Sequence, residues 1–479
     1  MDRSVLTKAD FATIGRRQWL ELVARTLGSE TGYESLIRHR DDGASIAPLY
    51  EPAEGPSPIS RGKTKTPWKI VQRLDDPDPG RANEQARDDL ENGATGLSFV
   101  FAGAPNAFGY GLPASREGLE TVLNNIPLKN VHLRIDVHPQ SRASIDWLAE
   151  ILQEKRADPA EMTLSFGIDP ASLFAGTGRL RMSIEALEAS MPPSLAGFFA
   201  MSLPGILLEA DGRVFHNAGA TEAQELGIML ASAVAHLKMF EEARQPLIYA
   251  APHIGFALAV DQNQFLSMAK IRALRKLWAR VQEACGIAPA PANIHAETSY
   301  RMMTVRDPEA NILRTTIAAF AAAAGGADSL SVLPHTIAHG LPNSFARRIA
   351  RNEQLILARE SRLDSVADTS SGSGGIEALT ASLCEKAWDE FSRIEEEGGI
   401  LRSLAAGHVQ ARIADARTHR LDALSRGACT IVGTTLYKQD KEPAVSTLEA
   451  ERQIMPPDGA IACTPLPASR LDEGLGEHE

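Results

Sequence analysis

Charged side chains follow a short apolar run that begins at Asn293. The run Asn293-Ile-His-Ala-Glu-Thr-Ser alternates apolar and polar positions, which predicts a strand that ends in polar groups. Glu297 and Arg301 lie at that end, and the carboxyl ends of the strands carry the chemistry of parallel α/β barrels. The two residues either act on a substrate or form an internal ion pair that plugs the site. We favour the ion pair.

Histidines are the next candidates for acid–base or metal chemistry. His216 follows Asp211-Gly212, which resembles a tight turn, so we expect it after a hairpin and before a helix that begins near Thr221. There it either contacts a substrate or caps or packs against that helix, and we favour the second interpretation. His335 and His339 are four residues apart in an expected loop, a spacing that gives no metal geometry by itself.

Other chemical signatures are weaker still. Gly372-Ser-Gly-Gly375 is rich in glycine, but we expect no strand before it and it has no Lys-Ser or Lys-Thr ending, so a phosphate cradle is not expected. The sequence contains no recognisable Ser-His-Asp or zinc signature. We therefore expect no metal site in this chain.

Strands and helices that alternate with short connections must position these residues. This grammar predicts an α/β fold, a (β/α)8 TIM barrel. We expect an N-terminal helix and extended arm over residues 1–66, the barrel over 67–437 and a loop-rich C-terminal tail over 438–479. The expected barrel strands are Gly96–Ala102, Val131–His138, Met162–Ile168, Leu195–Leu203, a segment within Leu247–Val260, Ile294–Thr298, Ser329–Leu333 and Cys429–Thr434.

The N-terminal arm combines an amphipathic segment with a proline- and glycine-rich stretch. Phe11, Trp19, Leu22 and Val23 suggest one apolar face of a helix. The stretch over residues 44–66 has the composition of an extended segment. The arm wraps either a partner subunit or its own barrel, and the sequence leaves both possibilities open.

Composition limits the class of protein. The net charge of −12 argues against a nucleic-acid partner, which requires a basic surface. No apolar run of membrane-spanning length occurs, so no membrane interaction is expected. The four cysteines are scattered, which predicts reduced, buried thiols and a cytoplasmic location.

Several motifs occur in the order found in one enzyme family. They are Pro67-Trp68-Lys-Ile-Val-Gln72, Lys270-Ile-Arg-Ala-Leu-Arg-Lys-Leu-Trp278, Asn311-Ile-Leu-Arg-Thr-Thr-Ile, Phe345-Ala-Arg-Arg-Ile-Ala-Arg-Asn-Glu-Gln and Ser371-Gly-Ser-Gly-Gly-Ile-Glu377. Together they resemble the barrel domain of adenosylcobalamin-dependent acyl-CoA mutases. Within the methylmalonyl-CoA mutase family, the chain is similar to the small (beta) subunit type, which lacks the cobalamin-binding domain.

The resemblance also identifies the positions that contact substrate or line the adenosyl side in active chains of the family. At each of them this sequence carries a different residue type. A valine cannot pair with a phosphate or carboxylate as an arginine can, and a bulky arginine in place of a tyrosine would fill or reshape a substrate tunnel. The positions are Thr66, Lys69, Val71, Arg73, Glu297 and Arg301.

The resemblance further implies a cofactor and a partner. Active chains bind cobalt through an Asp-x-His-x-x-Gly motif, whereas Asp136-Val-His138 here lacks the glycine and lies on an expected strand. We therefore expect adenosylcobalamin to be held by a large (alpha) subunit in a heterodimer, with acyl-CoA bound in the holoenzyme. This chain would stabilise that subunit without catalysing the reaction.

Two alternatives remain open. The chain could be the substrate-binding half of an acyl-CoA mutase that borrows cobalamin from a separate protein. It could also be a barrel scaffold or chaperone without a mutase partner. Formation of product with a cobalamin-domain protein alone would distinguish the first, and the absence of any longer mutase chain in the source would favour the second.

Overall fold

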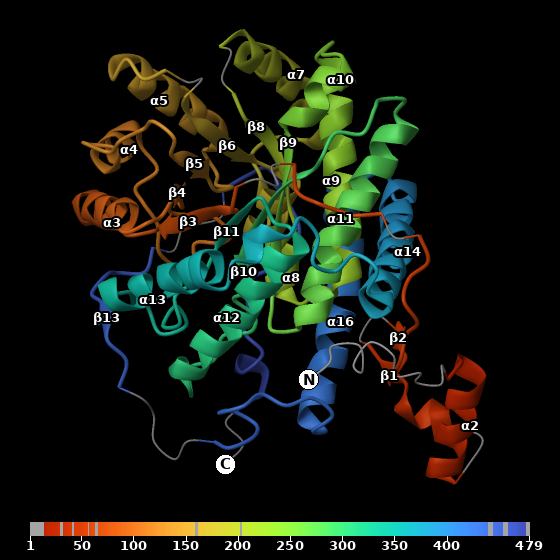
Figure 1. The fold of residues 1–479 in the computed structure, drawn as a ribbon. Helices are drawn as coiled ribbons and strands as arrows, with labels where there is room; N and C mark the ends of the chain where they lie inside the picture. The colour runs from red at the N-terminus through yellow and green to blue at the C-terminus, as the bar shows by residue number, and fades with distance from the viewer. Residues whose placement is uncertain are drawn as a thin grey trace, which may run out of the picture.

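The computed structural model describes residues 14–28, 32–40, 43–55, 57–62, 66–158, 161–201, 204–438, 444–453 and 458–475. Its centre is a closed barrel of parallel strands in the order β10-β11-β3-β4-β5-β6-β8-β9 (Figure 1). The fold class expected from the sequence, a (β/α)8 barrel, is confirmed. The strands are β3 (Lys69–Leu74), β4 (Gly96–Phe99), β5 (His132–Ile135), β6 (Thr163–Ile168), β8 (Ile206–Asp211), β9 (Ile254–Val260), β10 (Asn293–Thr298) and β11 (Ser329–Ser331).

Helices surround this barrel on its outer side (Figure 1). Those that lie between barrel strands are α3 (Pro79–Glu91), α4 (Arg116–Val122), α5 (Ser141–Glu154), α6 (Pro170–Thr177), α7 (Ile184–Ala200), α8 (Arg213–Ala218), α9 (Glu222–Glu242), α10 (Leu247–Ala250), α11 (Gln264–Ala284) and α12 (Pro308–Gly325). Those that follow the last strand are α13 (Ser344–Leu355), α14 (Gly374–Glu396), α15 (Ile400–Ala406) and α16 (His408–Ser425).

Local chemistry explains where the best-predicted elements begin and end. Helix α9 starts at a capping box in which the Thr221 and Gln224 side chains satisfy each other's backbone N–H groups. Helix α12 starts after the N-cap Asp307 and ends at Gly326, which has a φ of 90°, a backbone conformation that glycine adopts without steric cost. Strand β9 is buried along its whole length, as expected for a parallel strand covered by helices.

Three strand predictions are wrong. The first barrel strand is β3, whereas the first predicted strand is Gly96–Ala102. Residues 195–200 belong to α7, and the barrel strand in this region is β8. The acidic residues at positions 209 and 211 are atypical of a buried strand, so β8 was not predicted. The segment Cys429–Thr434 forms no barrel strand and contributes only an isolated bridge between Val432 and Leu436.

The N-terminal arm divides into two parts. Its first part is the helix α2 (Arg16–Leu27), in which no described residue is buried and which projects away from the barrel (Figure 1). In its second part, the Ala53 and Ile59 N–H groups donate to Gly372 O at 3.2 Å and to Asp368 Oδ2 at 2.7 Å. The second part therefore packs on its own chain. The candidate helix residue Phe11 lies outside the described residues.

The C-terminal tail returns to the barrel. Its strand β14 (Ile461–Ala462) pairs with β7 (Arg179–Leu180). Farther on, the Ser469 N–H donates to Asn217 O and the Leu471 N–H to Arg301 O, both at 3.0 Å. The tail thus crosses the loops that follow β8 and β10.

Two expectations about the chain as a whole can be compared with the structure. Within the described ranges, every helix is too short or too polar to cross a membrane. All four cysteines are free thiols, but Cys285 and Cys429 are exposed, so the expectation that all of them are buried is wrong.

Candidate functional site

Arg73 extends from the carboxyl end of β3 into a buried ion-pair network. Its Nε donates to Asp75 Oδ2 at 2.7 Å, and its Nη1 lies 3.6 Å from Glu297 Oε2 at the end of β10. Its Nη2 donates to the backbone oxygen of Asn106. Side chains on alternate positions of a barrel strand point to the interior, which directs this guanidinium into the mouth of the barrel.

Two further arginines complete the network. Arg134 of β5 makes a bidentate pair with Glu209 of β8, with N–O distances of 2.5 and 2.6 Å. Arg213, at the start of α8, contacts Asp136 and donates to Asp211 Oδ2 at 2.6 Å. Arg213 Nη1 also lies 3.3 Å from Glu297 Oε1. All of these side chains are buried.

The network contains more carboxyl groups than guanidinium groups. Arg73, Arg134 and Arg213 face Asp75, Asp136, Glu209, Asp211 and Glu297. Burial raises the pKa of Glu209 and of Glu297, although the arginines act in the opposite direction. Burial also acts to raise the pKa of Asp136, but Arg213 and Arg134 hold it below its usual range. Protons retained on the glutamates would remove the excess negative charge.

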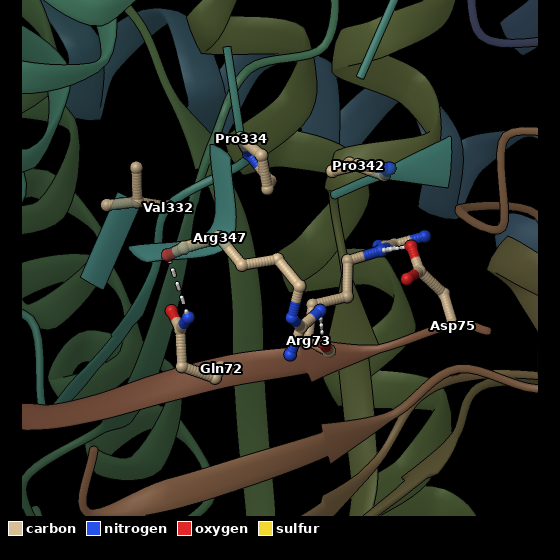
Figure 2. A pocket seen from close by; sticks show the side chains of 7 residues that line it. All are labelled: Gln72, Arg73, Asp75, Val332, Pro334, Pro342 and Arg347. Atoms are coloured by element: carbon tan, nitrogen blue, oxygen red, sulfur yellow. Dashed lines mark hydrogen bonds and ion pairs between the residues drawn. The ribbon is translucent and has the colours of Figure 1, made fainter. Parts of the chain in front are cut away.

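Little free volume remains beside Arg73. The cavity between the ends of β3 and β11 and helix α13 holds about 10 Å³, close to the minimum for one water molecule. Figure 2 shows the Arg347 side chain reaching the backbone of Arg73, where its Nη1 donates to Arg73 O at 2.7 Å, while the Arg73 guanidinium turns toward Asp75. Protein side chains fill this part of the barrel mouth.

A column of stacked groups lies over the network. The Arg73 guanidinium sits 4.9 Å from the centre of the Phe108 ring, and that ring stacks on Tyr300 with 4.2 Å between centroids. Arg470 of the tail donates to the Tyr300 hydroxyl at 3.2 Å. Cation–π and stacking contacts of this kind are strongest when water is excluded. The column therefore joins the barrel interior to the C-terminal tail.

Arg301 lies outside the network. It pairs with Glu222 at 3.1 Å and with Asp261 at 3.4 Å, and it donates to the backbone oxygens of His216 and Ala220. The predicted ion pair between Glu297 and Arg301 is therefore wrong, because Glu297 pairs with Arg73 and Arg213 instead. Arg301 braces the loop between α8 and α9.

His216 lies in helix α8, which directly follows β8, so the predicted hairpin before it is wrong. Its Nδ1 is 3.0 Å from Glu225 Oε2 and its Nε2 is 2.9 Å from Ser299 Oγ. Lys270 Nζ donates to the same Glu225 oxygen at 2.6 Å. Burial, together with Arg301 and Lys270, holds the pKa of His216 well below its usual value. His216 is thus a neutral, fully buried packing residue.

The remaining predicted site residues lie toward the amino end of β3. Thr66 is exposed ahead of the strand, where its backbone oxygen accepts from Arg61 Nη2 at 2.6 Å. Lys69 is the first residue of β3 and pairs in register with Ser329. Val71 is buried between them and Arg73. Lys69, Val71 and Arg73 share β3 and Thr66 precedes it, but only Arg73 reaches the charged network.

Among the residues that the structure describes, one group of three carboxylates has the spacing of metal ligands. Ligand oxygens of Asp136, Glu209 and Asp211 lie within 4.8 Å of one another. Arg134 and Arg213 already pair with these carboxylates. Their guanidinium groups therefore supply the positive charge that a bound metal ion would supply. His138, near Asp136, is buried with Nε2 3.1 Å from Ser144 Oγ and packs on Phe101 at 4.6 Å between ring centroids.

Arg134, Asp136, Glu209, Asp211 and Arg213 were not predicted as site residues. A signal was present, because Arg134-Ile-Asp136 and Glu209-Ala-Asp211 place charges two residues apart, on one face of a strand. The pairs of Arg134 with Glu209 and of Arg213 with Asp136 join segments that are far apart in the sequence. Only the closed barrel brings them together.

The fold and the site together define a (β/α)8 barrel protein whose carboxyl mouth, where barrel enzymes place catalytic groups, is filled by paired charges. The family model for methylmalonyl-CoA mutase matches residues 51–456. The chain belongs to the methylmalonyl-CoA mutase family, a family of isomerases that is in general cobalamin-dependent.

Its relatives include proteins named as small subunits. The methylmalonyl-CoA mutase small subunit of Streptomyces virginiae is 34% identical over 99% of this chain and 77% of its own length. A probable small subunit from Mycobacterium bovis is 43% identical over 93% of this chain and 75% of its own length. A methylmalonyl-CoA mutase from Escherichia coli is 26% identical over 96% and 69%, respectively. The name "small subunit" implies a larger partner subunit.

Proposed function

We propose that this chain is the non-catalytic small subunit of an adenosylcobalamin-dependent methylmalonyl-CoA mutase, and that it stabilises a large (alpha) subunit in a heterodimer. The observation that carries this proposal is the position of Arg73, paired with Asp75 and Glu297 in the barrel mouth. Ligand sites for small molecules usually offer about 300–1,000 Å³. The cavity beside Arg73 offers about 10 Å³.

Moving Arg73 aside to admit an acyl thioester would be costly. It would leave Asp75 and Glu297 without their guanidinium partner in a buried site, and breaking a buried pair typically costs about 3–5 kcal/mol. Phe108 and Tyr300 would also have to separate, because Arg73 lies on the Phe108 ring. Binding of substrate would thus have to disrupt the packed interior.

The residues of this chain do not fit cobalamin. His138 is engaged with Ser144 and packed against Phe101, so its ring is not available to a cobalt ion. The tail residues Ser469 and Leu471 bond to the loops at the barrel mouth, on the side where the family places the adenosyl group. We therefore assign adenosylcobalamin, acyl-CoA binding and the isomerisation of (R)-methylmalonyl-CoA and succinyl-CoA, a step of propionate metabolism, to the large subunit of the holoenzyme.

The proposal includes the organisation and location of the chain. We divide it into an arm (1–66), a mutase-type barrel (67–437) and a tail (438–479). The contacts support a partner-binding role only for the first part of the arm, because α2 has no buried residue whereas Ala53 and Ile59 bond to their own chain. Four free thiols are typical of a cytoplasmic protein.

Reconstitution tests the proposal. The purified chain is mixed with the large mutase chain of its native source, and the thermal midpoint of each chain and succinyl-CoA formation are measured. We expect activity only with the large chain and a higher midpoint for that chain in the mixture, because a partner that binds the native state stabilises it. Succinyl-CoA formed by this chain with a separate cobalamin-domain protein alone would contradict the proposal and support a substrate-binding half.

A further inference from the structure

Helix α12 has an unusual outer face for a barrel helix. From Leu313 to Gly325 its only charged residue is Arg314, which is buried. Helix α3, in the same outer layer (Figure 1), instead exposes charged residues to solvent. A helix that is apolar on all sides is normally covered on all sides. The exposed residues of α3 are Glu84, Arg87, Asp88 and Glu91.

The exposed side chains of α12 form a line along the helix, which begins with Glu309 and continues with apolar residues. Leu313 is 68% exposed and Ile317 is 40% exposed, and Phe320 is half-buried beyond them. Residues three and four positions apart lie on the same side of a helix. The opposite side, with Thr315 and Ala319, is buried against the barrel.

A loop after α16 extends this line. Val432, Leu436 and Tyr437 are exposed, Tyr437 to 79%. Arg314 Nη2 donates to Val432 O at 2.6 Å, which fixes the loop to α12. We call Leu313, Ile317, Phe320, Val432, Leu436 and Tyr437 the outer ridge.

The guanidinium group of Arg314 is buried and does not make the outer face of α12 polar. Its Nη1 donates to Asn311 Oδ1 at 2.7 Å and to Thr304 Oγ1 at 3.0 Å, so the guanidinium is held under the ridge and supports the loop. The ridge therefore exposes large apolar side chains on a rigid support. Apolar anchors on a rigid surface are typical of protein-binding sites.

We propose that the outer ridge is a docking surface for the large mutase subunit. This inference rests on the proposed function. Relatives that cover 93–99% of this chain are named small subunits, so a larger chain is the expected occupant. A second copy is disfavoured, because two chains with a net charge of −12 each repel one another.

Paired charge substitutions test the ridge. The double variant Leu313→Glu/Ile317→Glu is compared with Ile248→Glu/Tyr249→Glu, whose parent side chains are also exposed but lie on α10. Affinity for the large subunit of the native source is measured by titration, and folding by circular dichroism. We expect the ridge variant to bind at least about 100-fold more weakly and the control within about threefold of wild type. All three proteins should share one thermal midpoint.

A second ridge variant, Val432→Glu/Tyr437→Glu, lies outside any helix or strand and guards against a folding defect in α12. Wild-type affinity in both folded ridge variants would overturn the docking surface and leave the heterodimer intact. A ridge-dependent dimer of this chain alone would overturn the assigned occupant. Failure of the two wild-type subunits to associate at all would instead overturn the proposed function.

Discussion

The mouth of the barrel and the outer face of α12 both differ in polarity and exposure from those of a typical barrel enzyme. The mouth contains the charged residues Arg73, Arg213 and Glu297, all buried. The outer face exposes Leu313 and Ile317. In a barrel enzyme, charges at the mouth face a substrate pocket and outer helix faces are polar. Here the mouth is closed by internal pairing and the outside is left apolar.

The buried charges and the exposed apolar side chains contribute differently to stability. Buried ion pairs are weak sources of stability, because desolvation offsets most of their attraction. The Arg213 network is thus better explained as a group of buried residues that neutralise one another than as a source of stability. Exposed apolar groups gain free energy only when a partner covers them. This difference is what the proposed role as a partner-stabilising subunit requires.

The largest effect on stability is expected when the ion pairs at the barrel mouth are broken. Replacing Arg213 by Met leaves Asp136, Asp211 and Glu297 short of a cation inside the barrel. We expect the free energy of unfolding to fall by about 3–5 kcal/mol, measured by urea denaturation. Arg17→Met, at an exposed position of α2, should change it by less than about 0.5 kcal/mol. Equal stabilities would show that the network is not structurally important.

A buried carboxyl beneath the ridge predicts a pH effect. Glu353 of α13 accepts from Thr315 Oγ1 at 3.1 Å, and burial raises its pKa to about 8. The folded protein therefore holds this proton more tightly than the unfolded chain. Its stabilising contribution is lost as the pH rises from about 4.5 through 8.

Glu353→Gln should reduce the fall in the free energy of unfolding as the pH rises. Between pH 5 and pH 9 the wild type should lose roughly 2–4 kcal/mol more than the variant, measured as the free energy of unfolding at each pH. Glu360→Gln, at an exposed position beyond the helix, is the control. Parallel curves for wild type and Glu353→Gln would contradict the assigned pKa.

The arm should contribute little to the stability of the barrel. Deleting residues 1–28 removes α2, which buries no described side chain, so the free energy of unfolding should change by about 0.5 kcal/mol or less. Affinity for the large subunit should fall. Deletion through residue 60 should also destabilise the barrel, because it removes the bonds of Ala53 and Ile59. Unfolding of the shorter truncation would show that α2 packs on its own chain.

The smallest expected effect is on mutase activity, which we expect Arg73→Tyr to leave absent. Arg73→Tyr should yield no succinyl-CoA from methylmalonyl-CoA and adenosylcobalamin, because Val71, Glu297 and the surrounding pairs are unchanged and residues that act as a unit are not additive. Liquid chromatography with mass detection provides the assay. Detectable turnover by this variant would show that the mouth retains a working site.

Much of the fold could be predicted from local sequence. The sequence predicts helices over Arg81–Asn92, Thr221–Arg244, Gln264–Cys285 and Asn311–Ala324. These ranges agree with α3, α9, α11 and α12 to within a few residues, because capping residues and helical periodicity are local signals. Strand β8 was missed, because Glu209 and Asp211 are charged residues on a buried strand. Glu209 pairs with Arg134 of β5, which lies far from it in the sequence, and no local pattern reports such distant pairing.

The candidate site was predictable only in part. Arg73 and Glu297 could be singled out from the sequence, but the partners of Glu297 could not. Arg301 was nearer in sequence than Arg213, yet Arg213 lies 3.3 Å from Glu297 and Arg301 is held by Glu222 and Asp261. Inward alternation along β8 and β10 decides this pairing, and it depends on the register of the closed barrel.

We propose that this chain contributes a surface and that its partner carries out the chemistry. Titration with adenosylcobalamin, followed by absorbance, tests it most directly on the lone chain and on its complex with the large subunit. We expect no binding by the lone chain and a single cobalamin for each heterodimer. Micromolar binding by the lone chain, with the spectrum of a histidine-ligated cobalt, would contradict it.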